Sequence, residues 1–324
     1  MYNQPETILE QYDLEIRQIT KGRGTYICDS SQGMKLLVPF RGSADRALFL
    51  RKVLSLLKEG GYDVEQICLT REGNAVAEDE SGTRYWLKDM ITGSECSPGR
   101  RMDMAGAVTE LAKLHVALSQ CGCEIPGFMQ SEPDETQNRC GRHCRELVRM
   151  KNYVQSRKTK NEFERCFQKA FPHFFDQAQR ALELMEHTDF DLLNGELCHG
   201  DFNQHNVQKT SMGFRIVNFE NMCCQSQVWD LANFIRKMME KNGWDTELGQ
   251  SLLETYDRKR RLSEQEKKLL YSALLFPEKF WKITNHYRNS HKAWVSQRDI
   301  DKLNRLVEIE PQREWFLENL FSFL

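Results

Sequence analysis

The sequence has no apolar run that approaches the roughly 18 residues a membrane-spanning helix needs. Its first residues, MYNQPETILEQYD, lack the basic start and apolar centre of a secretory signal. It also lacks a charge excess, because 45 Lys and Arg face 47 Asp and Glu for a net charge of −2. That balance excludes a general attraction to nucleic acid or to an acidic membrane. We therefore expect no membrane span, no nucleic-acid partner and residence in the cytoplasm where the chain is made.

Internal repeats, low-complexity segments and long linkers are absent as well. The 324 residues, 40% of them hydrophobic, suffice for one large or two ordinary globular domains. Cysteine is abundant, with 11 residues, and without a secretion signal these are expected to be reduced thiols. The nearest approach to a zinc site is Cys121, Cys123, Cys140 and Cys144 with His143. Their spacing is not a repeated CxxC pair, so we interpret them as buried thiols.

A polar loop followed by a short strand carries the clearest chemical signal. The loop reads ELCHGDFNQHNV and the strand FRIVNFE, and WDLANFIRK then starts a helix at Asp230. Phosphoryl transfer uses an aspartate to accept a hydroxyl proton, and an asparagine with a strand carboxylate to hold Mg²⁺ against the nucleotide phosphates. Asp201 is accordingly the candidate base. Asn206, Asn218 and Glu220 are the candidate metal ligands.

This motif resembles the catalytic loop and metal strand of the aminoglycoside phosphotransferase-like kinases, where HGD…N is followed by I-D-F-D or I-D-F-E. One position departs, because Asn218 stands where that family has its metal-binding aspartate. A neutral amide removes a unit charge that metal binding uses. Glu220 would compensate, since residues 218 and 220 of an extended strand share a face. His199 belongs to the catalytic set mainly as organiser of the loop. Asp230 has a plain N-cap explanation, and the resemblance implies that it also braces the loop.

The first 91 residues have the element order of a small kinase lobe with an antiparallel sheet and one helix. The turn Lys21-Gly22-Arg23-Gly24 is either a plain hairpin turn or a loop that covers phosphates. The hydrophobic patterns predict strands at 14–20, 25–28 and 34–40, a helix from Ser43 to Lys58, a strand at 65–69 and a hairpin over 75–90.

The phosphate-binding lysine that the third strand of such lobes carries is missing or displaced. Val38 occupies its position, and Lys35, three residues earlier, projects from the opposite face of the strand. We interpret Lys35 first as an exposed strand lysine and second as a nucleotide ligand. Met90 and Ile91 lie where the chain crosses to the larger lobe, and backbone groups there would hold the adenine of ATP.

The rest of the chain is predicted to be mainly helical, with a helix over 102–118 at the base of the larger lobe. Ser263 and Glu266 form a capping box, and Pro311 opens or breaks the last helix. The helix 141–160 is strongly basic. A solvated face is the first interpretation of this helix, and a docking surface for an acidic or phosphorylated partner is the second. Nucleic acid is disfavoured because aromatic residues do not alternate with the charges.

Several longer stretches carry a closer resemblance. They are GSEC with a following helix that contains LAKLH, HCRELVRMKNYVQSRKTKNEFE, NFE with VWDLANFIRKMMEKNGWD, and LLFPEKFWKITNHYRNSHKAW. These stretches are similar to the CotS family of spore coat proteins. The resemblance implies an α+β, bilobal protein kinase-like fold, with a small N-terminal lobe over 1–91 and a mainly helical C-terminal lobe over 92–324 that carries the motif at 197–220. It also implies synthesis in the mother-cell cytoplasm and assembly into the spore coat with other coat proteins.

Two functions remain open at this point. The first is a structural or scaffolding coat protein whose phosphotransfer is impaired or absent. The alternative is an ATP- and Mg²⁺-dependent phosphotransferase that acts on a hydroxyl of a small molecule or coat protein. The retained HGD…N favours catalysis, whereas Val38 and Asn218 oppose it. We therefore expect the structural or scaffolding coat protein. Inactivation of an aminoglycoside is disfavoured because the basic helix is a poor surface for a polycationic substrate.

Overall fold

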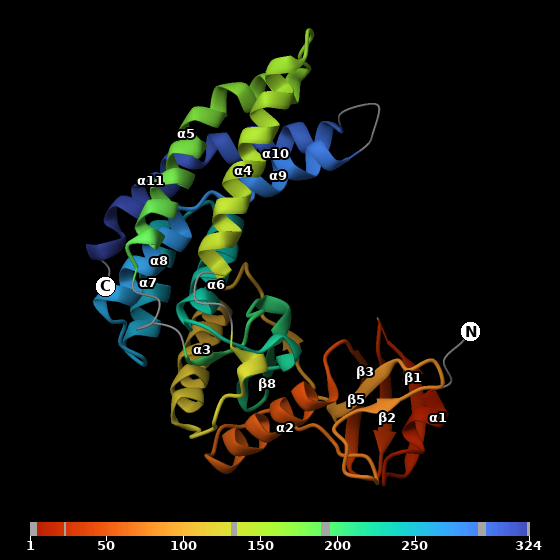
Figure 1. The fold of residues 1–324 in the computed structure, drawn as a ribbon. Coiled ribbons are helices and arrows are strands. Elements are labelled where there is room, and N and C mark those ends of the chain that lie inside the picture. Colours follow the sequence, from red (N-terminus) through yellow and green to blue (C-terminus); the bar gives the residue numbers. More distant parts are fainter. Residues whose placement is uncertain (1–4, 23, 131–134, 189–194, 291–295, 323–324) are drawn as a thin grey trace. The chain divides into compact units, whose positions relative to one another are not determined.

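The computed structural model describes residues 5–22, 24–130, 135–188, 195–290 and 296–322 (Figure 1). Arg23 of the predicted KGRG loop lies outside the described residues. The chain forms two compact units. The first consists of Met1–Ser97, Gly106–Gln130 and Glu196–Cys224, and the second of Pro98–Ala105, Ser131–Gly195 and Gln225–Leu324. The first unit contains the expected N-terminal lobe together with the polar loop motif. The lobe boundary at residue 91 stays a prediction.

An antiparallel sheet dominates the N-terminal part of the first unit, as predicted, and Figure 1 shows it with helix α1 (Pro5–Leu9) beside it. Its order is β1 (Ile16–Lys21), β2 (Tyr26–Ser30), β3 (Gly33–Phe40), β5 (Arg84–Asp89) and β4 (Ala77–Glu78). Cys28, Leu37 and Leu87 bury one face of this sheet against Ile8 and Leu9.

The register of β3 and β5 sets what lies on each face. Lys35 pairs with Asp89, and the next pair along the strands is Leu36 with Lys88. Paired residues of antiparallel strands project from the same face, and successive residues alternate. Lys35 therefore shares the α1 side of the sheet with Leu37, whereas Leu36 and Lys88 project from the other side.

Helix α2 (Ala44–Glu59) follows strand β3 in the chain, at the position that the sequence predicts. The Ser43 side chain caps it by accepting a hydrogen bond from the Arg46 backbone. The predicted strand at 65–69 is wrong. This segment makes only an isolated bridge, between Ile67 and Lys88, because a side chain rather than a neighbouring strand binds part of its backbone. The Asp89 carboxylate accepts the backbone N–H of Gln66 at 3.1 Å. The hairpin over 75–90 is confirmed as β4 and β5.

Short elements position the polar loop in the rest of the first unit. The C-terminal part of α3 (Arg101–Gln120) belongs here, as does the helical turn η1 (Gly127–Met129). The short strands are β6 (Ser94–Glu95), β7 (Leu197–Cys198), β8 (Val207–Thr210), β9 (Gly213–Ile216) and β10 (Cys223–Cys224). They form a three-stranded sheet in the order β6-β8-β9 and a β10-β7 pair. The turns η3 (Gln204–Asn206) and η4 (Phe219–Asn221) lie between these strands.

The second unit is helical. Figure 1 shows α4 (Glu135–Ser156) and α5 (Glu162–Glu186) as two long helices. Phe167 and Phe174 of α5 stack on Phe280 and form part of the core. The capping box of Ser263 and Glu266 is confirmed, and Pro311 lies in the first turn of α11. Across the residues that are described, no helix combines the length and apolar character needed to cross a membrane. The helices are α4 (Glu135–Ser156), α5 (Glu162–Glu186), α6 (Val228–Lys241), α7 (Thr246–Asp257), α8 (Glu264–Leu275), α9 (Glu278–Asn289), α10 (Gln297–Glu308) and α11 (Glu310–Asn319).

Candidate functional site

The tight start of the polar loop depends on Gly200. Its φ of +80° lies in the left-handed region that favours glycine. A Cβ at this position would overlap the carbonyl oxygen of Asn221. The loop between β7 and β8 can therefore approach the chain that precedes β10 only because residue 200 has no side chain.

His199 holds the loop from inside. Its side chain is fully buried, between Phe202 and Phe219. The Asp201 backbone N–H donates to its Nδ1 at 3.3 Å, and Nε2 lies 3.0 Å from the Val217 carbonyl oxygen. With Nδ1 as acceptor, Nε2 carries the proton and donates to Val217. Both ring nitrogens thus orient backbone, which supports the organising role for His199.

Asp201 presents a carboxylate at the surface, held by two neighbouring amides. The Asn203 amide donates to Asp201 Oδ1 at 3.1 Å, and the Asn206 amide lies 3.4 Å from Oδ2. Both amides also donate to the Asp201 backbone oxygen at 2.9 Å. The residue is exposed, so an acceptor hydroxyl can approach it. This arrangement suits the predicted base.

The structure brings the predicted metal ligands Asn206 and Asn218 together, but as partners of each other. Asn218 Nδ2 donates to Asn206 Oδ1 at 2.8 Å. Asn218 Oδ1 in turn accepts from Lys88 Nζ at 2.7 Å. An ammonium can only donate, so the oxygen of Asn218 must face Lys88 and its nitrogen must face Asn206. Both side-chain oxygens therefore bind protein donors.

Lys88 and Glu65 form a buried ion pair beside Asn218 that the sequence interpretation missed. Lys88 Nζ lies 3.0 Å from Glu65 Oε1, and the two side chains are 1% and 2% exposed. The same Glu65 oxygen accepts the backbone N–H of Asn218 at 2.9 Å. Charged residues this deeply buried are almost always paired. The available signal was a lysine within the otherwise apolar strand core YWLK, but its glutamate is 23 residues away in sequence.

Glu220 does not lie on a strand with Asn218. Strand β9 ends at Ile216, Asn218 has left-handed backbone angles (φ 68°, ψ 63°), and Glu220 lies in η4. The expectation that residues 218 and 220 share a strand face is therefore wrong, because the chain turns at Asn218. Glu220 Oε2 is buried and has no hydrogen-bond partner among the described residues, while the Glu220 backbone oxygen accepts from Arg46 at 3.2 Å.

These contacts do not fit the Mg²⁺ that a kinase-like motif implies. Mg²⁺ requires oxygen ligands at about 2.0–2.1 Å in near-octahedral geometry, commonly from one or two carboxylates. Here Asn206 offers its oxygen to an amide, and Asn218 offers its oxygen to an ammonium. The two amides thus form a hydrogen-bonded chain that needs no cation, and among the three predicted ligands only Glu220 keeps a buried carboxylate oxygen without a hydrogen-bond partner in the described part of the chain.

A pocket of about 230 Å³ lies next to these residues, within the first unit. Met90 and Ile91, the predicted adenine contacts, line it. So do Glu65 and Asn218, and Leu36 lines it from β3. The pocket is therefore placed where the sequence predicts the nucleotide.

Lys35 lies on the other face of β3 from Leu36. It is 6% exposed, and its Nζ contacts Asp89 Oδ1 at 2.6 Å. Burial lowers its pKa, but Asp89 and Cys68 together outweigh burial through hydrogen bonds and charge, so the net shift of the Lys35 pKa is upward. The interpretation of Lys35 as an exposed lysine is wrong. The Lys35 side chain also projects from the face of β3 opposite Leu36, which lines the pocket, so its position does not support a role as nucleotide ligand.

Asp230 is a helix residue rather than the helix cap. Helix α6 begins at Val228 with Gln227 as its N-cap, so the N-cap explanation of Asp230 is wrong. The helix starts earlier because Val228 and Trp229 are apolar and pack in the interior. Asp230 is 2% exposed in the first turn, where an acidic side chain is favoured by the helix dipole. Its role in bracing the loop stays a prediction.

The basic stretch 141–160 is interrupted in the structure. Helix α4 ends at Ser156, and Asn161 starts α5 in a capping box with Glu164, so the predicted helix is wrong beyond residue 156. Arg142, Arg145 and Arg149 are exposed on α4. Leu147, Met150 and Val154 are buried on its other side. These burials agree with a solvated basic face, and the acidic partner stays a prediction.

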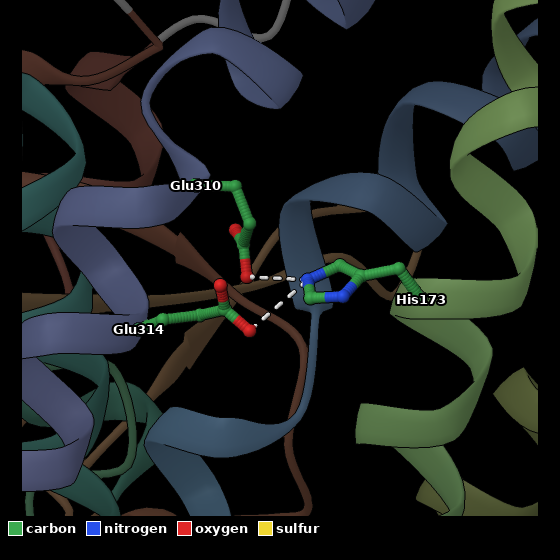
Figure 2. A group of neighbouring side chains, drawn as sticks. All are labelled: His173, Glu310 and Glu314. Carbon is green, nitrogen blue, oxygen red and sulfur yellow. Dashed lines mark hydrogen bonds and ion pairs between the residues drawn. The ribbon is translucent and has the colours of Figure 1, made fainter.

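One group of side chains in the described part of the chain has the composition of a metal site. Figure 2 shows His173 of α5 directed toward Glu310 and Glu314 of α11, at 3.3 and 3.5 Å. Arg313 and Gln177 each donate to Glu310 Oε1 at 2.7 Å. An arginine already neutralises the buried carboxylate, so we interpret the group as a tie between helices. It contains none of the cysteines considered above, and each of the 11 cysteines is a thiol rather than half of a disulfide.

Solved structures with similar folds include phosphotransferases and kinases. An aminoglycoside phosphotransferase from Alicyclobacillus acidocaldarius superposes with a TM-score of 0.86 at 18% identity, covering 99% of this chain and 96% of that one. Spectinomycin phosphotransferase in complex with ADP and spectinomycin gives a TM-score of 0.64 at 15% identity, with 98% and 96% coverage. The predicted α+β kinase-like fold is confirmed.

Sequence relatives are spore coat proteins. Spore coat protein S of Bacillus subtilis (strain 168) is 22% identical over 333 residues, covering 97% of this chain and 92% of the relative. The endospore coat-associated protein YutH of the same organism is 24% identical over 296 residues, with 89% and 84% coverage. These relatives confirm the resemblance to the CotS family. The family model described as "Spore coat putative kinase YutH" matches residues 5–320, so the chain belongs to this family of kinase-like spore coat proteins.

Proposed function

We propose that this chain is a kinase-fold component of the bacterial spore coat that has a structural or scaffolding role and little or no phosphotransfer activity. The proposal depends on one observation, the hydrogen bond from Asn218 Nδ2 to Asn206 Oδ1 at 2.8 Å. An aspartate at position 218 would place an oxygen against the Asn206 oxygen and would need a cation between them. The amide supplies a donor instead, so the two ligand positions stabilise each other without a metal.

The location follows from the names of the relatives, which are a spore coat protein and an endospore coat-associated protein. We extend it to synthesis in the mother-cell cytoplasm and assembly with other coat proteins. Exposed arginines on α4 supply a surface for an acidic or phosphorylated partner, because guanidinium groups pair well with carboxylates and phosphates.

The pocket next to Asn218 suits a nucleotide such as ATP. Residues 90–91 line this pocket of about 230 Å³, and their backbone groups would hold the adenine. Among structures of similar fold, amicoumacin kinase is described in complex with AMP-PNP and Ca²⁺, and spectinomycin phosphotransferase with ADP. Nucleotide binding is thus the part of kinase chemistry that these residues retain best.

An active phosphotransferase is the second candidate. The observation that favours it is the exposed Asp201 carboxylate, which Asn203 and Asn206 orient. In that reaction Asp201 would accept the proton of a hydroxyl on a small molecule or a coat protein as the phosphoryl group arrives. Asn218 stands where a metal-binding carboxylate is expected, so this reaction would be slow. Neutralisation of the phosphate charge by the metal supplies much of the catalysis in phosphoryl transfer.

The decisive experiment measures hydrolysis and transfer of radiolabelled ATP phosphate by the purified full chain with Mg²⁺, beside Asp201→Ala. We expect the two proteins to show equal background rates. Asn218→Asp should raise the rate, because one carboxylate oxygen can stay on Lys88 while the other faces Asn206 and recruits a cation. Turnover in the unmodified protein that disappears in Asp201→Ala would instead establish the active enzyme.

A further inference from the structure

Lys88 places a full positive charge beside the position where kinase-like proteins hold their metal. Its Nζ contacts Asn218 Oδ1 at 2.7 Å and Glu65 Oε1 at 3.0 Å. We propose that Lys88, fixed by Glu65, is the resident cation of this site and takes the place of the divalent metal. The pocket then binds a nucleotide in its metal-free form. The nucleotide part rests on the function proposed above, whereas the exclusion of the metal does not.

The direction of the hydrogen bonds supports this assignment. Lys88 donates to Asn218, Asn218 donates to Asn206, and Asn206 donates to the backbone oxygen of Asp201. Each amide accepts at its oxygen and donates from its nitrogen, so the chain has a single polarity that starts at the ammonium. A divalent cation would need the two amide oxygens, and it would have to displace Lys88 from one of them.

Burial makes that displacement costly. Lys88 is 1% exposed and Glu65 2%, so a displaced ammonium would leave Glu65 as a buried, unpaired carboxylate. A divalent ion bound at the Asn218 oxygen while Lys88 stayed in place would meet a like charge across a poorly solvated distance. Either route disfavours the metal, and the Lys88–Glu65 pair already keeps that corner of the pocket from being acidic.

Lys88 differs in placement from the phosphate-binding lysine of kinases. It comes from β5, opposite Leu36 of β3, whereas the usual lysine is on the third strand, where this chain has Val38. Lys88 contacts Glu65 and Asn218, and both of these residues line the pocket. The charge of Lys88 thus acts through the side chains that it holds, which makes it a positioning residue.

The test uses Mn²⁺ as a probe on the full, nucleotide-free chain, with bound ion measured by electron paramagnetic resonance. We expect no binding at this site in the unmodified protein below about 1 mM. Lys88→Met leaves the Glu65 carboxylate and the Asn218 oxygen without their cation, and it should bind Mn²⁺ at least tenfold more tightly. Lys88→Met with Glu65→Gln removes both charges and should lose that gain. The His173 group is the same in all of these proteins, so it cannot produce the difference.

Two results would overturn the assignment: tight Mn²⁺ binding by the unmodified chain that Asn218→Ala abolishes, or a Lys88→Met protein that gains nothing. Lys88→Arg keeps the charge and should remain free of Mn²⁺. If Lys88→Met does not fold by circular dichroism, calorimetry of ATP binding to the unmodified chain with EDTA or Mg²⁺ decides. The affinities should agree within threefold, and a tenfold gain with Mg²⁺ would refute a resident cation.

The outcomes separate this inference from the proposed function. Phosphotransfer by the unmodified protein would end the proposed function, while the Mn²⁺ comparison would still report on Lys88. Failure of ATP to bind under either condition would remove the nucleotide from both proposals. The Mn²⁺ comparison would then still show whether Lys88 excludes the metal.

Discussion

At the scale of single residues, position 218 shows how replacing one oxygen by nitrogen changes what a site can hold. An aspartate there could only accept hydrogen bonds, and it would face the Asn206 oxygen across a short gap that a cation must fill. Asn218 donates across that gap and accepts from Lys88 on its other side. Asn218 thus bonds to Asn206 while Asn206 keeps its hydrogen bond to the Asp201 backbone oxygen.

Gly200→Ala should destabilise the first unit strongly. Glycine is required because φ is +80° and a Cβ would overlap the Asn221 carbonyl oxygen. Strain of this kind costs about 1–3 kcal/mol in the free energy of unfolding, and the overlap adds to it. Urea denaturation followed by circular dichroism measures the loss. The matched control is Gly127→Ala, where an added Cβ has open space and the change should stay within about 0.5 kcal/mol. Equal stability of Gly200→Ala and the parent would mean that the loop relaxes freely.

The sequence was sufficient to predict that Asp201, Asn206 and Asn218 lie together, because all three fall within one short stretch. Their roles in catalysis and metal binding stay predictions. The sequence could not find Lys88 and Glu65, which are 23 residues apart and meet only through the pairing of β5 with its neighbours. Lys35 was misinterpreted for a related reason. The alternation of side chains along β3 correctly predicted the face of the sheet from which Lys35 projects. Whether that face is buried depends on α1 and Asp89, and no local sequence pattern shows this.

At the scale of elements, the caps predicted at Ser43 and Ser263 agreed with the structure, whereas the cap predicted at Asp230 and the strand predicted at 65–69 did not. Ser43 caps α2 and Ser263 caps α8, since each side chain bonds to its own helix. The segment 65–69 has the apolar pattern of a strand, yet Asp89 and β5 hold it with an isolated bridge. The basic stretch breaks after residue 156 because Asn161 and Glu164 start a new helix.

Helix α4 should make the stability of the second unit sensitive to mild acid through His143. Burial lowers the pKa of this histidine, although Glu278 and Glu146 oppose the shift. A histidine whose pKa is lower in the folded protein is neutral there, while the unfolded chain gains a proton below about pH 6.5. Stability is therefore complete above that pH and falls as the pH drops toward the folded pKa.

His143→Phe should reduce this pH dependence. The ring of His143 stacks on Trp281 with centroids 3.5 Å apart, and phenylalanine preserves the stack without a titrating group. We expect the difference in free energy of unfolding between pH 7.5 and pH 5.5 to be smaller in the variant than in the parent, with urea denaturation as the measurement. Other titrating groups contribute to both proteins, so the change in the difference reports on residue 143. An unchanged difference would show that His143 is not held neutral.

At the scale of the whole molecule, the kinase-like fold and membership of a spore coat family are compatible if the fold supplies surfaces rather than turnover. Catalysis and coat assembly then depend on different residues. Asp201 belongs to the polar loop, whereas the exposed basic side chains belong to α4, where Leu147 and Met150 hold the helix from its buried side. Changes confined to exposed positions of α4 should leave the fold intact.

Coat retention should consequently follow the basic face and not the loop. Replacing Arg142, Arg145 and Arg149 by glutamate reverses the charge of exposed positions, so an acidic or phosphorylated partner would be repelled. We expect the tagged triple variant to shift from purified spores to the soluble mother-cell fraction, as measured by immunoblot, by at least threefold. Asp201→Asn keeps the size of the loop residue and should be retained like the parent. If Asp201→Asn leaves the spore and the triple variant stays, assembly requires the chemistry of the loop, and a purely structural role for this fold is ruled out.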